Sequence, residues 1–204
     1  SKISAGSATT GGILSSDGSA WSWGSNSYGQ LGNNDSEYGS SRSSPVSVVG
    51  DHIFTKISGG QNHMLGLKSD GSVWAWGGNS AGQLGTNNII DRSSPVSIAG
   101  DHSFVDISAS TGFSAAIRGD GTAWTWGTGS NGQLGNNSIG SASSPISVVG
   151  DHTFTKIVCG GTHILGLKSN GEVWSWGSGA PVPTMIFGQL GDGTRQGRSS
   201  PVSV

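Results

Sequence analysis

Short runs of β-forming residues, separated by glycine, serine, asparagine or proline, extend along the whole chain. No stretch has the 3.6-residue periodicity of an amphipathic helix. In one 50-residue unit the expected strands are Phe54–Ser58, His63–Lys68, Ser72–Trp76 and the equivalent of Val46–Val49. Both alternating faces of residues 73–76 (Val-Trp-Ala-Trp) are apolar, which predicts a sheet that is covered on both sides.

One segment, Asp70 to Gly77, summarises the local pattern and recurs at residues 17–24, 120–127 and 170–177. Its Asp-Gly pair predicts a tight two-residue hairpin turn in which both residues have positive φ. A short β-forming run with two tryptophans follows the turn.

Three further landmarks follow this segment at fixed spacing. Gly-Gln-Leu-Gly occurs at residues 29–32, 82–85, 132–135 and 188–191, and Ser-Ser-Pro places prolines at positions 45, 95, 145 and 201. Three units continue with Gly-Asp-His and a Phe-x-x-Ile run. Four short strands in each unit of about 50 residues predict an all-β fold of the β-propeller class, because one such blade is too small to bury both faces alone. We expect a single domain over residues 1–204, with units at about 1–49, 50–99, 100–149 and 150–204.

The repeat resembles that of the regulator of chromosome condensation family. The similarity is clearest from Gly59 to Gly85, where Gly-Gly-x-x-His-x-x-Gly-Leu-Lys-x-Asp-Gly-x-Val-Trp-x-Trp-Gly leads into Gly-Gln-Leu-Gly, and it extends over essentially all 204 residues. The resemblance implies a propeller, most often of seven blades, whereas this chain has four repeats. Some members of that family catalyse nucleotide exchange on a small GTPase through protein–protein contact.

The two ends of the chain match neighbouring strands of the repeat. Residues 1–4 match a Lys-Ile-Ser strand and residues 201–204 match the strand that precedes it. We therefore expect the terminal strands to complete one blade, either within the chain or between chains. A ring of four blades, a two-fold dimer with eight blades and an open filament are all compatible with this pattern. The start has neither a signal-peptide core nor an initiator methionine, as expected of a longer precursor or a trimmed chain.

Composition narrows the function classes. Charged residues make up 11% of the chain, the net charge is −2, and the few basic residues are spread through the repeats. These features argue against a nucleic-acid partner. No apolar run is long enough to insert into a membrane. The glycine- and serine-rich, weakly charged repeats are similar to bacterial or viral versions, which favours an extracellular or particle-surface location by analogy.

Candidate chemistry is sparse, and we predict no enzyme activity, no cofactor and no metal. The Asp-His pairs at residues 51–52, 101–102 and 151–152 are interpreted as turns, because adjacent residues of an extended chain point in different directions. Cys159 is interpreted as a small core residue. His63 and His163 are interpreted as structural polar residues, although the resemblance places their strand start at the face where family members engage partners.

We expect a non-enzymatic scaffold that binds a protein partner or assembles with itself, with a surface adhesion protein, a glycan-binding lectin and a GTPase exchange factor as alternatives. The candidate partner-binding residues lie in a six-residue insertion of the fourth unit and at two strand starts: Pro181, Val182, Pro183, Met185, Ile186, Phe187, Gln61, Asn62, His63, Thr162 and His163. The tryptophans are expected to pack between blades: Trp21, Trp23, Trp74, Trp76, Trp124, Trp126, Trp174 and Trp176. Three extra residues occur in the first unit, within residues 35–40.

Overall fold

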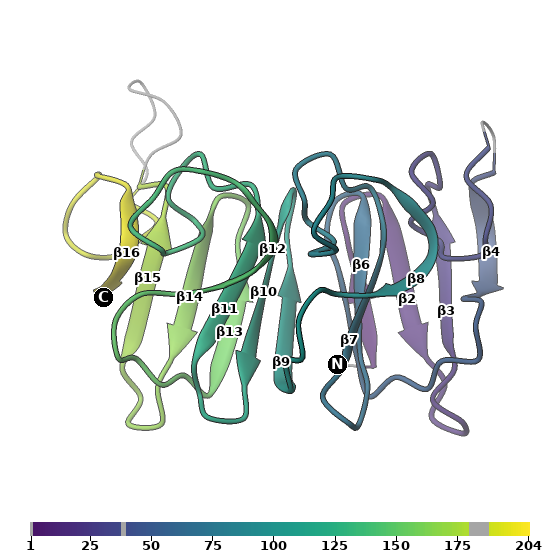
Figure 1. Cartoon of the computed structure of the whole chain (residues 1–204), viewed down its shortest axis with the longest axis horizontal. Helices are drawn as coiled ribbons and strands as arrows, with labels where there is room; N and C mark the ends of the chain where they lie inside the picture. Colours follow the sequence, from purple (N-terminus) through teal and green to yellow (C-terminus); the bar gives the residue numbers. More distant parts are fainter. Residues whose placement is uncertain (1, 38–39, 180–187) are drawn as a thin grey trace.

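The computed structural model describes residues 2–37, 40–179 and 188–204, and it consists of four antiparallel four-stranded sheets (Figure 1). Blade 1 contains β1 (Ile3–Ala5), β2 (Thr9–Ile13), β3 (Ala20–Gly24) and β4 (Arg42–Ser47). Blade 2 contains β5 (Lys56–Gly59), β6 (His63–Leu67), β7 (Val73–Gly77) and β8 (Arg92–Ser97). Blade 3 contains β9 (Phe104–Ala109), β10 (Phe113–Arg118), β11 (Ala123–Gly127) and β12 (Ala142–Ser147). Blade 4 contains β13 (Lys156–Cys159), β14 (His163–Leu167), β15 (Val173–Gly177) and β16 (Arg198–Ser203).

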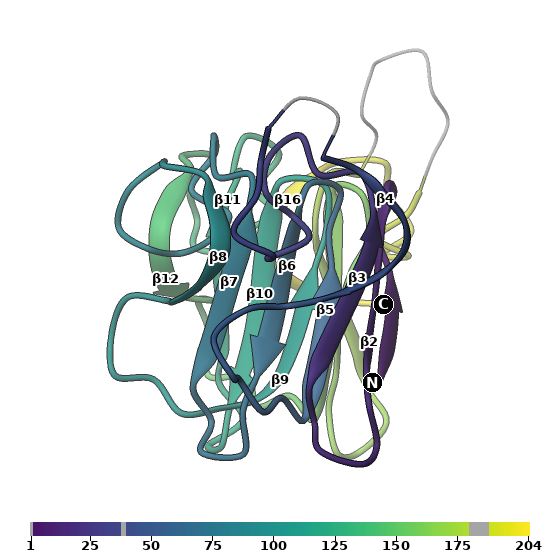
Figure 2. The ribbon, with the colours of Figure 1, turned by 90° about the vertical axis from the view of Figure 1, so that its right-hand side faces the viewer.

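The blades stand side by side in an arc, with β4 and β16 at its two ends (Figure 1). The first strands of successive blades, β1, β5, β9 and β13, are neighbours in the middle of the molecule. In the view turned by 90°, the strands of all four blades again run roughly along the vertical. The connections between strands therefore lie at two opposite ends of the molecule (Figure 2). The all-β architecture of four four-stranded blades agrees with the sequence-based prediction.

The expected sharing of one blade by the two terminal strands is wrong. β1 pairs with β2 in blade 1, whereas β16 pairs with β15 in blade 4. The Lys-Ile-Ser strand opens a blade and the Ser-Ser-Pro strand closes one. The Gly-Asp-His segment between them is therefore the connection from one blade to the next.

The Asp-Gly turn also differs from its prediction. β6 ends at Leu67 and β7 begins at Val73, so five residues connect them. Only Gly71 has positive φ, at 84°. Asp70 instead accepts a hydrogen bond from the Ser72 main-chain N–H through Oδ1, at 2.9 Å. This Asx turn forms through the aspartate side chain rather than through two left-handed residues.

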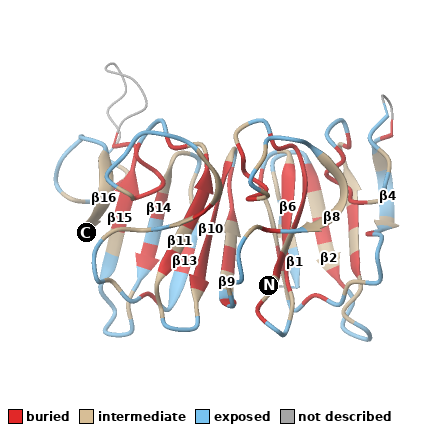
Figure 3. Cartoon of the chain, viewed as in Figure 1, coloured by how far each residue is buried: buried red, intermediate tan, exposed pale blue. Residues whose placement is uncertain are grey.

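The hydrophobic core lies between blades. One cluster joins Leu65, Leu67 and Val73 of blade 2 to Phe104, Ile107 and Trp126 of blade 3, and equivalent clusters join blade 1 to blade 2 and blade 3 to blade 4. Each blade therefore presents a trailing face, formed by alternate residues of its second and third strands, to the leading face of the next blade. Buried residues concentrate on the strands, where neighbouring blades pack against each other (Figure 3).

A tryptophan hydrogen bond crosses every blade boundary. The indole Nε1–H of Trp76 donates to the main-chain carbonyl of Gln30 at 3.1 Å, Trp126 to that of Gln83 at 2.9 Å, and Trp176 to that of Gln133 at 3.1 Å. All three indoles are fully buried. The loop that supplies the carbonyl is the Gly-Gln-Leu-Gly segment of the preceding blade.

The glycine that ends this segment makes the close approach possible. A Cβ at Gly85 would lie 2.9 Å from Nε1 of Trp126, and Gly85 has a φ of 70°. A side chain at this position would therefore both strain the backbone and displace the indole. Two residues later, the Asn87 main-chain N–H donates to the Ser143 carbonyl of the next blade at 2.7 Å. The loop thus clamps the following blade at two points.

A buried histidine completes the boundary between blades 2 and 3. His63 is 1% exposed, and its Nε2 lies 2.9 Å from Oγ of Ser114, which donates to the Gln83 carbonyl at 2.8 Å. Burial lowers the pKa of His63 to about 4. The imidazole is therefore neutral near pH 7 and acts as a packing and hydrogen-bonding group.

The hydrogen bond from the buried indole to the Gly-Gln-Leu-Gly loop, which we call the tryptophan clamp, predicts that substitutions of the two tryptophans of β11 lower stability by different amounts. Trp126→Phe should lower the free energy of unfolding by about 2 kcal/mol, because the buried indole hydrogen bond and part of the ring volume are lost. Trp124→Phe should cost about 1 kcal/mol or less, because half-buried Trp124 donates only to the Thr122 hydroxyl of its own turn. Urea unfolding followed by circular dichroism measures both, and equal losses would contradict the assigned role of the clamp.

The lowered pKa of His63 predicts a loss of stability in acid. The unfolded chain, with a histidine pKa of about 6.5, binds a proton at higher pH than the folded chain. His63 therefore stabilises the fold fully above about pH 6.5, and this contribution, about 3 kcal/mol, is lost as the pH falls towards about 4.

His63→Gln should weaken this pH dependence, because glutamine keeps a hydrogen-bonding group without titrating. Urea unfolding of both proteins over that pH range tests the expectation. Parallel pH profiles for the two proteins would show that His63 does not titrate in this way.

Candidate protein-interaction face

Two sets of connections lie at the same end of every blade. Because the strands are antiparallel, the turn between the first and second strands and the long loop between the third and fourth strands emerge together. We call this end the loop face. Its long loops span residues 25–41, 78–91, 128–141 and 178–197, apart from the undescribed residues 38–39 and 180–187, and they lie at the top of Figure 1.

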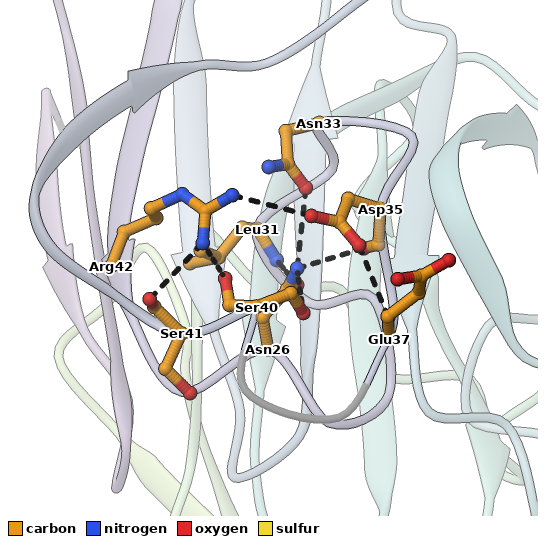
Figure 4. A network of polar contacts seen from close by, with 8 residues as sticks. All are labelled: Asn26, Leu31, Asn33, Asp35, Glu37, Ser40, Ser41 and Arg42. Carbon is orange, nitrogen blue, oxygen red and sulfur yellow. Dashed lines mark hydrogen bonds and ion pairs between the residues drawn. The ribbon is translucent and has the colours of Figure 1, made fainter.

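Buried polar side chains hold the first two long loops in shape. In blade 1, Oδ1 of Asn26 accepts from the Leu31 N–H at 2.9 Å, and its Nδ2 donates to the Asp35 carbonyl and to Oγ of Ser40 (Figure 4). Arg42 closes the loop through an ion pair with Asp35 at 3.3 Å. Asn79 bonds the N–H of Leu84 in the same way in blade 2. The framework of these loops is therefore fixed, and the residues between the anchors can vary.

Isoleucines project from two of these loops. Ile89 is 64% exposed and Ile90 57% in blade 2, and Ile139 is 70% exposed in blade 3. The equivalent stretch of blade 1, residues 33–37, is Asn-Asn-Asp-Ser-Glu. Exposed branched aliphatic side chains at these places contribute nothing to the core, so they are available to a partner.

Ile89 and Ile139 each border a shallow cleft between neighbouring blades. Ile89 lines a cleft of about 400 Å³ with Ser80 and Ala81 of its own loop and Ser141, Ala142 and Ser143 of blade 3. Ile139 lines a cleft of about 290 Å³ whose far wall includes Ser178, Gly197 and Ser199 of blade 4. Small side chains and one apolar rim residue therefore recur from one cleft to the next.

The turns between first and second strands surround an open central depression of about 390 Å³. Its wall includes Gly60, Gln61, Ser110 and Gly160, and the Ser110 hydroxyl donates to the Gly160 carbonyl of the next blade. The lining is mostly glycine, alanine and serine. Such a wall offers hydrogen bonds and little apolar surface.

The structure separates the residues predicted to bind a partner. Gln61 is exposed on a turn of the loop face, and Asn62 and Thr162 are half-buried beside the starts of their strands. His63 is buried between blades, and half-buried His163 has a pKa lowered by burial. Pro181, Val182, Pro183, Met185, Ile186 and Phe187 lie outside the described residues.

Sequence reasoning missed Ile89, Ile90 and Ile139. The available signal was the contrast within the repeat: apolar residues follow Gly-Gln-Leu-Gly in blades 2 and 3, where blade 1 has polar ones. The insertions are evident because they change the length of the repeat, whereas residues 89, 90 and 139 differ from their blade 1 counterparts only in side-chain chemistry.

Trp21 and Trp23 of blade 1 are both half-buried, and the tryptophans of blades 2, 3 and 4 fall into two groups. Trp76, Trp126 and Trp176 are buried between blades, whereas Trp74, Trp124 and Trp174 are half-buried. Each half-buried ring packs against a histidine of the Gly-Asp-His segment and a basic side chain. For Trp74 the His52 ring centroid lies at 4.1 Å and Nζ of Lys68 at 4.5 Å.

The histidines of the Asp-His pairs and Cys159 pack against neighbouring residues of the fold. Burial lowers the pKa of His52, and the positive charge of Lys68 lowers it further. The Cys159 sulfur lies 3.5 Å from the Ser108 carbonyl, and burial raises the pKa of the thiol to about 12. A thiol with that pKa is protonated and a poor nucleophile near pH 7.

Within the described residues, no group of three or more His, Cys, Asp and Glu could hold a metal ion, and no helix could cross a membrane.

Curated proteins similar to this chain match over less than half of it. Protein RCC2 from Homo sapiens is 37% identical over 81 residues, which are 39% of this chain and 15% of that protein. The ultraviolet-B receptor UVR8 from Arabidopsis thaliana is 35% identical over 80 residues, or 38% of this chain and 18% of the receptor.

Solved structures match nearly the whole chain and share its fold. Human WBSCR16 superposes with a TM-score of 0.82 at 24% identity, over 99% of this chain and 51% of that chain. Prp20p from Saccharomyces cerevisiae, described with its binding properties to Gsp1p and histones, superposes with a TM-score of 0.84 at 20% identity, over 99% and 49%. The chain thus spans about half the length of these structures.

The sequence profile of the Regulator of chromosome condensation (RCC1) repeat matches residues 17–67, 70–117 and 120–167. A second profile of the same repeat matches residues 1–30, 54–83 and 104–133. These matches cover more than half of the sequence and include its repeated tryptophan segment. The chain therefore belongs to the regulator of chromosome condensation repeat family.

Proposed function

We propose that this chain is a protein-binding module that engages its partner through the loop face. The observation that carries the proposal is the placement of exposed Ile89 and Ile139 at the rims of two adjacent clefts, with exposed Ile90 next to Ile89 in the chain. Apolar side chains flanked by main-chain and hydroxyl groups suit an extended protein surface, which needs a few apolar anchors and a polar rim. The buried Asn79 side chain, which holds the loop of blade 2, limits the entropy that Ile89 and Ile90 lose on binding.

A binding role suits this site better than an enzymatic one. The clefts are lined mainly by serine, glycine, alanine and asparagine, and the Cys159 thiol and the Asp-His pairs are committed to packing. Catalysis requires a nucleophile or an acid–base pair directed towards a shared point. We therefore propose a non-enzymatic scaffold.

No observation on the described residues favours the alternatives over this proposal. A lectin would need free aromatic faces, but His52 and Lys68 pack against Trp74. A nucleotide-exchange role rests on the family resemblance alone, and a shared fold does not determine a function. A surface adhesion protein would also use protein contacts, so it is one setting for the proposed activity.

The proposal predicts that three serine substitutions weaken peptide binding. A displayed library of random linear peptides is selected against the wild-type chain, and enriched peptides are measured by calorimetry against Ile89→Ser/Ile90→Ser/Ile139→Ser. We expect binding to weaken at least about tenfold, because the apolar anchors are lost. Circular dichroism should show an unchanged fold, since all three side chains are exposed.

The matched control is Ile53→Ser/Val105→Ser, which changes two comparably exposed apolar residues outside the long loops. This variant should bind the same peptides as the wild type. Peptides that tolerate the loop substitutions but lose affinity for the control variant would place the binding surface elsewhere and refute the proposal.

A further inference from the structure

An arginine begins the outer strand of three of the four blades. These arginines, the first residues of β4, β8 and β16, are Arg42, Arg92 and Arg198, and Ala142 takes their place in β12. Each arginine pairs across the sheet with the glycine that ends the third strand of its blade. The three side chains therefore start from equivalent places at the base of the long loops.

Two of these arginines are neutralised by an aspartate of their own loop. In blade 1, Nη2 of Arg42 lies 3.3 Å from Oδ2 of Asp35, as Figure 4 shows. In blade 4, Nε of Arg198 donates to Oδ2 of Asp192 at 2.8 Å. The aspartates stand at the third and the first position after Gly-Gln-Leu-Gly, respectively.

Arg92 of blade 2 lacks such a partner. The corresponding positions of its loop carry Thr86 and Asn88, which have no charge. Among the described residues, none forms a hydrogen bond or an ion pair with the Arg92 guanidinium, and its Nε is buried without an acceptor. The two terminal nitrogens are not buried. The neighbouring Asp91 instead accepts from the Asn79 main-chain N–H through Oδ1, at 2.6 Å.

The neutral residues at positions 86 and 88 shape the loop that exposes the isoleucines. Oδ1 of Asn88 accepts from the Ile90 N–H at 3.0 Å, and Nδ2 of Asn88 donates to the Thr86 carbonyl at 3.0 Å. These bonds fix the turn that contains Ile89 and Ile90. The loop that presents two apolar side chains is thus also the loop that leaves its arginine without a carboxylate.

The charge of Arg92 is incompletely compensated within the chain. Its buried Nε–H has lost water and gained no hydrogen bond, so the desolvation of this group is not offset. A guanidinium binds a carboxylate through two parallel hydrogen bonds, and the two terminal nitrogens can form both of them. A carboxylate that approaches the open end of this side chain therefore meets a partly desolvated positive charge.

Arg92 lies at the boundary between blades 1 and 2. A Cβ at Gly29 of blade 1 would lie 3.0 Å from the Arg92 carbonyl oxygen. Tyr28, the residue before Gly29, is 46% exposed and holds the position that lines the clefts of the next two boundaries. Three successive boundaries of the loop face therefore carry Arg92 with Tyr28, then Ile89, then Ile139.

We propose that Arg92 is the charged anchor of the loop face and binds an aspartate or glutamate carboxylate of the peptide segment that occupies it. This inference rests on the proposed protein-binding function and adds the chemistry of the partner, which is acidic beside its apolar residues. Charge complementarity favours an acidic segment over a neutral one, because a neutral segment would cover Arg92 without compensating its charge.

The test uses as probes the peptides that are selected from the displayed library against the wild-type chain. We expect aspartate or glutamate to be enriched at one peptide position. Arg92→Gln should weaken binding of these peptides at least about tenfold, because a charge-assisted pair of hydrogen bonds is lost. Replacing the peptide carboxylate by the amide should cause the same loss, and both changes together should cause little more.

The matched control is Arg195→Gln, which removes the charge of a fully exposed arginine of the same face. This variant should bind the acidic peptides as the wild type does. Equal weakening by Arg195→Gln and Arg92→Gln would indicate unspecific attraction to positive charge and would overturn the assignment of Arg92.

A second variant restores a carboxylate within the loop. Thr86→Asp places aspartate where blade 4 has Asp192, so that Arg92 pairs internally. The urea midpoint of unfolding should rise and the affinity for the acidic peptides should fall at least about tenfold. Thr86→Asn, with the residue that blade 1 has at this position, should change neither. Undiminished binding of acidic peptides by Thr86→Asp would refute the proposal.

The outcomes separate this inference from the proposed function. Peptides that lose affinity for the triple serine variant but bind Arg92→Gln unchanged would refute the role of Arg92 and leave the protein-binding function standing. Failure to select any peptide would refute both. Inorganic phosphate at the peptide concentration should not displace the peptide, and displacement would indicate a small-anion site and overturn the assignment to a peptide carboxylate.

Discussion

The indole hydrogen bond across each blade boundary is the contact on which the rest of the structure depends. It joins residues more than forty positions apart, such as Trp126 and Gln83, and it places the Gly-Gln-Leu-Gly loop of one blade over the core of the next. The same loop then bonds the outer strand through the Asn87 N–H. Three landmarks that look independent in the sequence are therefore parts of one interface. A blade cannot satisfy any of them alone, so folding and stacking of blades are coupled.

The repeat was sufficient to predict the blades but not where each blade begins. A period of about 50 residues is unchanged by any shift of its starting point, so the sequence alone did not place the boundary between Ser-Ser-Pro and Lys-Ile-Ser. Strand pairing decides it: β16 pairs with β15, and β1 with β2. The Asp-Gly turn was misassigned for a related reason. The dipeptide is compatible with a two-residue turn, but the Asp70 side chain satisfies the Ser72 N–H and permits a longer connection.

The candidate site was only partly predictable, because its residues depend on contacts between blades. His63 was expected to be a structural polar residue, which its burial supports, but its partner Ser114 lies in the next repeat and is not conspicuous in the sequence. Ile89 and Ile139 became informative once the loops around them were seen to be held by buried asparagine or to border clefts. Exposure separates a binding isoleucine from a core isoleucine, and the sequence does not report it.

The internal boundaries also fix the order of the blades. Blade 1 carries Gly11 on the face towards blade 2, where the facing second-strand residue is Met64, whereas blade 2 carries Leu65 on the face towards blade 3, where the facing residue is Ser114. A Cβ at Gly11 would lie 2.7 Å from Cε of Met64, so a larger residue at position 11 would require Met64 to move. Overpacking of this kind costs about 1–3 kcal/mol. Each small face is therefore matched by a large one on the next blade, and exchanging blades 2 and 3 would bring two large faces into contact. The order of the repeats in the sequence is thus part of the packing of the fold.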